Sequence, residues 1–307
     1  MVCLPQVIAI AGSTGFLGSH LCAFLRSQGH TVLRLVRHKP QQYVSSDIYW
    51  NPDSGHIETH GLEGVQIAIN LCGANVAERR WSATQKKYIR DSRIKSTQLL
   101  SHAISKLLRP PRLLISSSAT GYYGNRENEV VEEDSPRGAG FLPDLCADWE
   151  QASAEAKKKG LRVCHARTGI VLSPDGGVLK ELLPLFRVGL GGPIGSGEQY
   201  LSWVSLTDWI QAILHIINTE SLEGPVNITA PNAVTNREFT HTLGRVLNRP
   251  TALAIPAFAI KFIFGEMGET LFLEGNRAIP KRLTDSGFQF AHPDLEIALR
   301  FLLNRSK

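Results

Sequence analysis

The first half of the chain alternates short apolar runs with longer segments of helical periodicity. Runs rich in apolar residues, which are typical of strands buried on both faces, occur at residues 7–11, 31–36, 67–71 and 113–117, and residues 162–167 are predicted as a further strand. Between them, apolar residues recur at helical spacing at residues 16–27, 82–108 and 141–159. This alternation predicts an α/β fold, with a doubly wound parallel sheet, helices on both faces and right-handed crossovers.

The pattern changes after residue 170. A glycine-rich loop at residues 190–197 precedes a predicted helix, strand and helix at residues 205–218, 225–228 and 236–247, and a mostly helical tail at residues 256–307. We therefore expect residues 1–170 and 205–230 to form the sheet domain. Residues 171–204 and 231–307 are expected to form a smaller C-terminal α/β lobe.

Composition and charge exclude several classes of protein. The 307 residues are 43% hydrophobic and 20% charged, which excludes a wholly disordered chain. The net charge of +5 is mild, and no basic tract alternates with aromatic residues, so we expect no nucleic-acid partner. No apolar stretch reaches the roughly 20 residues of a membrane span, and the apolar N-terminus lacks the basic start of a signal peptide. We therefore expect no membrane association.

Cysteine and histidine usage bears on compartment and metal binding. The five cysteines are widely spaced and form no CxxC pair; they are Cys3, Cys22, Cys72, Cys146 and Cys164. This pattern predicts buried free thiols in a reducing compartment, and hence a cytoplasmic location. The ten histidines contain no HExxH pattern, so we expect no metal site.

A glycine motif, GSTGFLG at residues 12–18, stands between the first predicted strand and the first predicted helix. Glycines there allow a tight turn and let the backbone approach a pyrophosphate, whose charge rests on the helix N-terminus. This context favours dinucleotide binding over glycines that merely end a strand. The predicted fold is therefore of the Rossmann type, with cofactor contacts at Gly12, Thr14, Gly15, Phe16, Leu17 and Gly18.

The end of the second predicted strand indicates which dinucleotide binds. An acidic residue there binds the ribose of NAD, whereas an arginine accommodates the 2′-phosphate of NADP. The run at residues 32–39 has no acidic residue, and Arg37 falls at the strand end. We therefore predict NADP(H), in its reduced form NADPH, as the cofactor. The alternative that Arg37 is an ordinary surface cation stays open.

Several motifs resemble a known family. GSTGFLG, NLCGA at residues 70–74, SSSATGYYG at 116–124 and SWVSLTDW at 202–209 are similar to the extended short-chain dehydrogenase/reductases, in the NAD-dependent epimerase/dehydratase group. RRW at 79–81, DSRIKST at 91–97, LGGPIGSG at 190–197 and GEMGETLFLEG at 265–275 resemble its epimerase-family branch, often labelled cell-division-inhibitor-like. The resemblance covers nearly the whole chain.

The resemblance implies further cofactor contacts. The residues that it places along the cofactor cleft are Leu71, Cys72 and Gly73 after one strand, Arg93 in the long helix, and Arg167 and Val171 near the nicotinamide end. Arg93 would reach the cofactor phosphates, because a guanidinium bonds strongly to phosphate oxygens. The alternative is a helix-surface arginine paired with Asp91 or another neighbour.

The catalytic pattern of the family is incomplete. Members that act on carbonyls use a serine with a tyrosine and a lysine spaced YxxxK, and the tyrosine transfers the proton. Ser118 matches the serine, but Leu142 stands at the tyrosine position and Cys146 at the lysine position. Tyr123 is a candidate for the missing phenol; the alternative that it only packs structurally stays open.

Two functions follow as hypotheses. The first is an NADP(H)-dependent oxidoreductase or epimerase-like enzyme that transfers a hydride to or from an unknown small polar substrate, with Ser118 orienting the substrate oxygen. The second is an NADP(H)-binding regulatory or interaction module without efficient catalysis, as the label of the branch suggests. A protein partner and a homo-oligomer both stay open.

Overall fold

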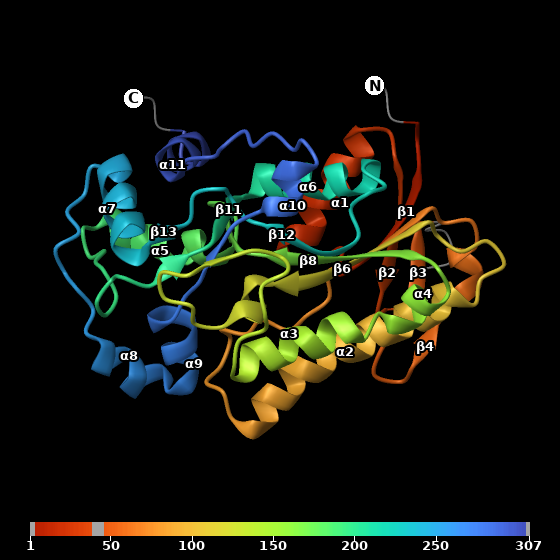
Figure 1. The fold of residues 1–307 in the computed structure, drawn as a ribbon, viewed down its shortest axis with the longest axis horizontal. Coiled ribbons are helices and arrows are strands. Elements are labelled where there is room, and N and C mark those ends of the chain that lie inside the picture. Colours follow the sequence, from red (N-terminus) through yellow and green to blue (C-terminus); the bar gives the residue numbers. More distant parts are fainter. Residues whose placement is uncertain (1–3, 39–45, 305–307) are drawn as a thin grey trace.

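The computed structural model describes residues 4–38 and 46–304, and its centre is one large sheet (Figure 1). Eight strands follow the order β12-β8-β6-β5-β1-β2-β3-β4. They are β1 (Val7–Ala11), β2 (Thr31–Val36), β3 (Asp47–Asn51), β4 (His56–Ile57), β5 (Ile67–Asn70), β6 (Leu113–Ala119), β8 (Arg162–Thr168) and β12 (Gly224–Ile228). Neighbours pair in parallel except β3 and β4. The predicted doubly wound α/β fold is confirmed.

Helices cover both faces of this sheet (Figure 1). α1 (Phe16–Ser27) and α6 (Leu206–Asn218) cover one face, and α2 (Ala83–Ser105), α3 (Phe141–Gln151) and α4 (Ala154–Lys158) cover the other. The side chains of β1 alternate between them: Ile8 and Ile10 join the core with α1 and α6, whereas Ala9 and Ala11 join the core with α2 and α4. An apolar run without polar alternation is what such two-sided burial requires.

A smaller lobe has a core of its own. It contains α5 (Gly177–Arg187), α7 (Asn236–Leu247) and α11 (Leu295–Leu302), packed around Phe186, Phe239 and Leu243. Short ladders accompany it, β9 (Ile170–Leu172) with β11 (Trp203–Ser205) and β10 (Tyr200–Leu201) with β13 (Val234–Thr235).

The tail crosses between the lobe and the sheet. α8 (Ala257–Phe264), α9 (Glu266–Gly268) and a π-helical turn at Glu269–Leu273 precede β14 (Arg277–Ala278), which pairs with β7 (Val130–Val131). α10 (Lys281–Asp285) then packs on β12, and Leu283 and Phe288 join the core of the sheet domain. This part of the tail therefore packs with the sheet rather than with the lobe.

The predicted helix at residues 141–159 is interrupted in the structure. α3 ends at Gln151 and α4 begins at Ala154. The hydroxyl of Ser153 donates to the carbonyl oxygen of Glu150 at 2.8 Å and lies 2.9 Å from the ring nitrogen Nε2 of His165. A serine that bonds locally to the backbone competes with helix hydrogen bonds, and here that contact replaces a continuous helix.

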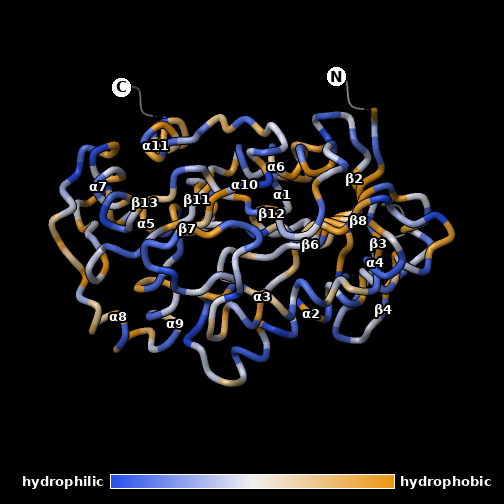
Figure 2. The backbone as a smooth tube through the Cα atoms, in the orientation of Figure 1, coloured by the Kyte–Doolittle hydropathy of each residue, from blue (hydrophilic) through white to orange (hydrophobic). Residues whose placement is uncertain are grey.

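Several absences concern only the described residues. No helix within residues 4–38 and 46–304 has the length and apolar character that a membrane span needs. In the same ranges no three His, Cys, Asp or Glu side chains gather as metal ligands. Cys22, Cys72, Cys146 and Cys164 are free thiols, and Cys3, like the last residues of the tail, lies outside the described residues. Figure 2 shows hydrophobic positions along the central strands.

Asp208 in α6 links the tail to the sheet domain by hydrogen bonds. We therefore predict that its removal lowers stability. Its buried carboxylate accepts the backbone N–H groups of Ala291 at 2.8 Å and His292 at 2.9 Å. We expect Asp208→Ala to lower the free energy of unfolding by about 3 kcal/mol, because both donors lose a charged acceptor. Urea denaturation measures this.

The exposed residue Asp294 provides the control, because the one hydrogen bond found for its carboxylate within the described residues is a long one from Asn232 at 3.4 Å. Asp294→Ala should stay within about 0.5 kcal/mol of the wild type. Equal urea midpoints for both variants would contradict this role of Asp208.

Candidate functional site

The turn at residues 12–18 is held by contacts between backbone atoms. Gly12 has φ +79°, and a Cβ there would lie 2.8 Å from the carbonyl carbon of Leu71 at the end of β5. A Cβ on Gly18, in the first turn of α1, would collide with the carbonyl oxygen of Gly12. Only glycine fits both positions, so β1, α1 and β5 meet with no side chain between them. The N–H of Gly15 donates to Gly12 across the turn at 3.1 Å.

A cleft of about 890 Å³ opens beside this turn. The predicted cofactor residues that line it are Gly12, Thr14, Gly15, Arg37, Leu71, Cys72 and Gly73. Phe16 lies outside the lining, with its ring against Gly176 before α5, and Leu17 packs on the hydrophobic core. Gly18 serves the turn by its lack of a side chain.

Part of the cleft lining was missed by the sequence reasoning. One wall comes from β3 and the turn after it, through Trp50, Pro52 and Asp53. It was missed because that strand had not been predicted. Another wall is a stripe on α2, formed by Thr84, Tyr88, Ser92 and Ser96 together with Lys87, Asp91 and Lys95. The spacing of four residues in the stripe 84–88–92–96 is the signal that could have identified it.

The floor of the cleft suits an anion. The hydroxyl of Ser13 is buried and has no hydrogen-bond partner within the described residues. Gly15 is the N-cap of α1, so no side chain caps the first N–H groups of the helix, and the first turn holds no acidic residue. Free N–H groups and the positive end of the helix dipole favour a phosphate at this position. These residues therefore fit the pyrophosphate of a dinucleotide.

Arg37 is exposed just past β2 and lines the same cleft. Its neighbour Arg34 points elsewhere and forms an ion pair with Asp47 at 2.6 Å. The lysines of the cleft have acidic neighbours, Lys87 at Asp91 and Lys95 near both Asp91 and Asp53. Within residues 4–38 and 46–304, Arg37 is the lining cation for which no ion pair is found.

Arg93 lies beneath the cleft wall rather than on the helix surface. It is 9% exposed; Nη1 donates to the carbonyl oxygen of Ile89 at 3.0 Å, and the guanidinium lies 4.9 Å from the ring centre of Trp149. A Cβ on Gly73 would lie 3.0 Å from its guanidinium carbon. Asp91 pairs with Lys87 instead, so the alternative of an Arg93–Asp91 pair is wrong. Burial lowers the pKa of Arg93 to about 10.

Arg167, in β8, is committed to neighbours inside the protein. Its guanidinium is 3% exposed and donates to Glu150 through Nε at 2.7 Å and Nη2 at 2.9 Å. Burial alone would lower the pKa of Arg167, but the hydrogen bonds and charge of Glu150 outweigh it and raise the pKa. The predicted contact with the nicotinamide end is therefore corrected for this side chain, which braces α3 against the sheet. Val171 is buried in the core of the sheet domain.

The two predicted catalytic side chains belong to the same internal network. The hydroxyl of Ser118 donates to Glu150 at 2.7 Å, and the hydroxyl of Tyr123 donates to Asn227 at 2.7 Å. Tyr123 is fully buried, and burial raises its pKa to about 12. Neither is among the described residues that line the two cavities. The phenol of Tyr123 is enclosed by the protein and the hydroxyl of Ser118 faces Glu150, so these contacts do not support the catalytic roles of Tyr123 and Ser118, which stay predictions.

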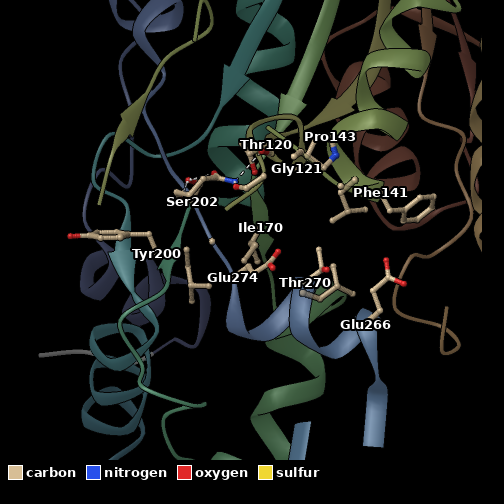
Figure 3. Close-up of a pocket in the computed structure, with 18 residues that line it drawn as sticks. Thr120, Gly121, Phe141, Pro143, Ile170, Tyr200, Ser202, Glu266, Thr270 and Glu274 are labelled. Atoms are coloured by element: carbon tan, nitrogen blue, oxygen red, sulfur yellow. Dashed lines mark hydrogen bonds between the residues drawn. The ribbon is translucent and has the colours of Figure 1, made fainter. Parts of the chain in front are cut away.

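A second cavity of about 220 Å³ lies beyond this network. The turn after β6, the first turn of α3, β9, β10 and residues 266–276 surround it. Its wall is tied together by Asn276, which donates to the carbonyl oxygen of Thr120 at 3.0 Å and accepts the hydroxyl of Ser202 at 3.2 Å (Figure 3). Leu142, at the family tyrosine position, lines this cavity, and Cys146 lies one turn deeper in α3.

Two carboxylates on this cavity were not foreseen from the sequence. Glu266 binds Lys86 at 2.6 Å, whereas no hydrogen bond or ion pair of the Glu274 carboxylate is found within the described residues. Burial, followed by the charge of Glu269, raises the pKa of Glu274. Figure 3 shows Glu274 beside Ile170, while the ring of Tyr200 extends away from the cavity. Glu274 is therefore a lining group that can hold a proton.

Comparison with known proteins shows the family of this chain. The family model described as NAD dependent epimerase/dehydratase family matches residues 8–229, and a domain of unknown function, DUF1731, matches residues 255–302. The epimerase family protein Mb2239 of Mycobacterium bovis is 49% identical, over 97% of this chain and 98% of that one. The epimerase family protein SDR39U1 of Homo sapiens is 35% identical, over 95% of this chain and 98% of that one.

Solved structures extend the comparison. A crystal structure of human SDR39U1 (isoform2) with NADPH superposes with a TM-score of 0.88 at 32% identity, covering 97% of this chain and 99% of that chain. UDP-glucose 4-epimerase of Thermotoga maritima, with UDP-glucose, reaches 0.75 at 16% identity over 97% and 99%, which shows the fold alone. The resemblance seen in the sequence is confirmed, and the chain belongs to the NAD dependent epimerase/dehydratase family.

Proposed function

We propose that this chain is an NADP(H)-dependent oxidoreductase or epimerase-like enzyme that transfers a hydride to or from a small polar substrate. The observation that carries the proposal is Arg37, a cation on the cleft at the end of β2 for which no ion pair is found within the described residues. An arginine at this position accommodates the 2′-phosphate that distinguishes NADP from NAD. The NADPH in the crystal structure of human SDR39U1 supports the same choice.

Different residues of the chain would then bind different parts of NADP(H). The turn at residues 12–15 and the N-terminus of α1 hold the pyrophosphate, and Arg37 holds the 2′-phosphate. Leu71, Cys72 and Gly73 direct the other half along the cleft toward the second cavity. When bound, NADPH supplies a hydride at its nicotinamide ring, and reduction of a carbonyl also requires one proton for the oxygen.

The proton has to come from a group other than the family tyrosine. Leu142 carries no acidic proton, and burial raises the pKa of the Cys146 thiol to about 12. Glu274 lines the second cavity, and burial keeps its proton to a higher pH than usual. We therefore assign Glu274 the protonation of the substrate oxygen during reduction, and the reverse during oxidation.

The presence of Leu142 and Cys146 at the family's tyrosine and lysine positions favours a second candidate function. A protein that binds NADPH without turnover would serve as a regulatory or interaction module, and the loss of the tyrosine and lysine is what such a protein would show. NADPH binding together with no oxidation of NADPH across a panel of aldehydes and ketones would favour this module over the enzyme. A partner, an oligomeric state and a cytoplasmic location stay predictions.

Reversal of the charge at Arg37 tests the cofactor assignment. We expect Arg37→Glu to weaken NADPH binding about 30-fold or more, while NADH binding changes little, because only NADPH carries the 2′-phosphate. Isothermal titration calorimetry gives both dissociation constants. Arg109→Glu makes the same charge change at an exposed position outside the cleft and should alter neither constant. Equal weakening of NADPH and NADH by Arg37→Glu would contradict the assignment.

Removal of the acid at Glu274 tests the proton route. We expect Glu274→Gln to lower turnover of the best carbonyl substrate about 100-fold and to leave NADPH affinity unchanged. In the wild type, the rate of reduction should fall as pH rises through the raised pKa of Glu274, because the protonated form is then lost. Stopped-flow absorbance of NADPH gives the pH profile.

Glu266→Gln is the matched control for this test, since Glu266 lines the same cavity but is paired with Lys86. It should retain most of the turnover and the alkaline fall of the wild type. A Glu274→Gln protein with wild-type turnover would show that the proton comes from elsewhere.

A further inference from the structure

The position on α3 that carries a lysine in related enzymes holds no charge here. Cys146 is buried, and its sulfur would lie 3.9 Å from a Cβ on Gly121, in the turn that lines the second cavity. Burial raises the pKa of this thiol to about 12, so it stays neutral at physiological pH. A positive charge near this position would therefore have to come from an element other than α3.

Arg93 on α2 places a cation beside that position. Its guanidinium lies over the ring of Trp149, which is three residues after Cys146 on the same side of α3. It also lies directly behind Gly73, which lines the cleft. Arg93 thus occupies the space between the cleft wall and α3.

This cation has no counter-charge in the part of the chain that the structure describes. The hydrogen bond found for its guanidinium uses Nη1 and a neutral carbonyl, that of Ile89, and no carboxylate forms an ion pair with it. A buried charge without a partner is costly. Arg167 is also buried, but it forms an ion pair with Glu150. Burial of an arginine in this protein is therefore not by itself the reason that Arg93 lacks a carboxylate partner. The missing interaction points to a ligand.

The direction of the cleft identifies the part of the ligand that lies nearest. Arg37 marks one end and Gly73 the other, with the glycine turn between them. The nicotinamide has to lie at the Gly73 end, because the second cavity begins beyond Cys146 and Gly121. The proposed phosphate position, over the turn at residues 12–15, is at the end of β1, whereas Arg93 lies behind Gly73, which follows β5.

We propose that Arg93 supplies, from α2, the positive charge beside the nicotinamide that related enzymes supply from a lysine on α3. This inference rests on the proposed binding of NADP(H), and it replaces the expectation that Arg93 contacts the phosphates. The oxidised nicotinamide is itself positively charged and the reduced one is neutral. A nearby cation therefore favours NADPH over NADP⁺ and makes bound NADP⁺ a stronger hydride acceptor.

The ratio of the two dissociation constants tests this directly and needs no substrate. NADPH and NADP⁺ carry the same phosphates, so a contact at a phosphate changes both affinities alike, whereas a charge beside the ring changes their ratio. We expect the wild type to bind NADPH about tenfold more tightly than NADP⁺, from one unit charge several ångströms from the ring. Calorimetry at a fixed, low salt concentration gives both constants.

Two substitutions separate charge from structure. Arg93→Gln keeps a donor for the carbonyl of Ile89 but removes the charge, and should bring the ratio of dissociation constants close to one. Arg93→Lys keeps the charge and should retain most of the preference for NADPH. Arg37→Gln is the control at a phosphate and should weaken both nucleotides equally, with the ratio unchanged.

Other outcomes overturn the inference in distinguishable ways. Equal weakening of both nucleotides by Arg93→Gln would assign Arg93 to a phosphate, and an unchanged ratio with unchanged affinities would leave it a structural residue. If Arg93→Gln fails to fold, the wild type and Arg93→Lys still decide, since equal binding of NADPH and NADP⁺ by both would refute the charge. A wild type that binds neither nucleotide would instead refute the proposed function itself.

Discussion

The whole site depends on one close approach of backbone to backbone. Gly12, Gly18 and the carbonyl of Leu71 meet with no side chain between them, which brings the ends of β1 and β5 against the first turn of α1. Any other residue at Gly12 or Gly18 would separate these elements. Their contact leaves the N–H groups of α1 and the hydroxyl of Ser13 facing a cleft instead of a protein partner. The affinity for an anion follows from this geometry.

The second constraint is the placement of charge around α3. Glu150 accepts hydrogen bonds from Arg167 and Ser118. The charges of the carboxylate and the guanidinium therefore neutralise each other inside the protein, and the hydroxyl of Ser118 has an acceptor. The positions nearer the second cavity, Leu142 and Cys146, are neutral. Within the described residues no ion pair is found for Arg93, on α2, or for Glu274, in the tail. On our proposals, the charged groups of the site therefore come from these two elements rather than from α3.

Local signals predicted most of the fold, because each was complete within a short window. The bounds of β1, α1, β2 and α7 agree with the predicted ranges, since apolar runs and caps determine them. The strand β3, Asp47–Asn51, was missed because its polar and aromatic residues give no apolar run. The break after Gln151 was missed because the helical spacing of apolar residues continues across it, while the hydroxyl of Ser153 bonds to the carbonyl oxygen of Glu150 and to His165 in β8.

The cofactor side of the site was predictable for the same reason, whereas the substrate side was not. The residues of the glycine turn and Arg37 follow one another closely along β1, α1 and β2, so motif and spacing identify them. Ser118 was chosen from the family resemblance and Tyr123 from its closeness to Ser118 in sequence, but their hydroxyl groups point to Glu150 and Asn227. Glu274 lies far along the chain from the glycine turn, and only the packing of the tail brings it to the second cavity.

A crystal structure of this protein with NADPH tests the central claim most directly. The account predicts the pyrophosphate over the turn at residues 12–15, the 2′-phosphate in contact with Arg37, and the nicotinamide between Gly73 and the second cavity. A dinucleotide bound in another place, or one whose 2′-phosphate lies away from Arg37, would contradict it.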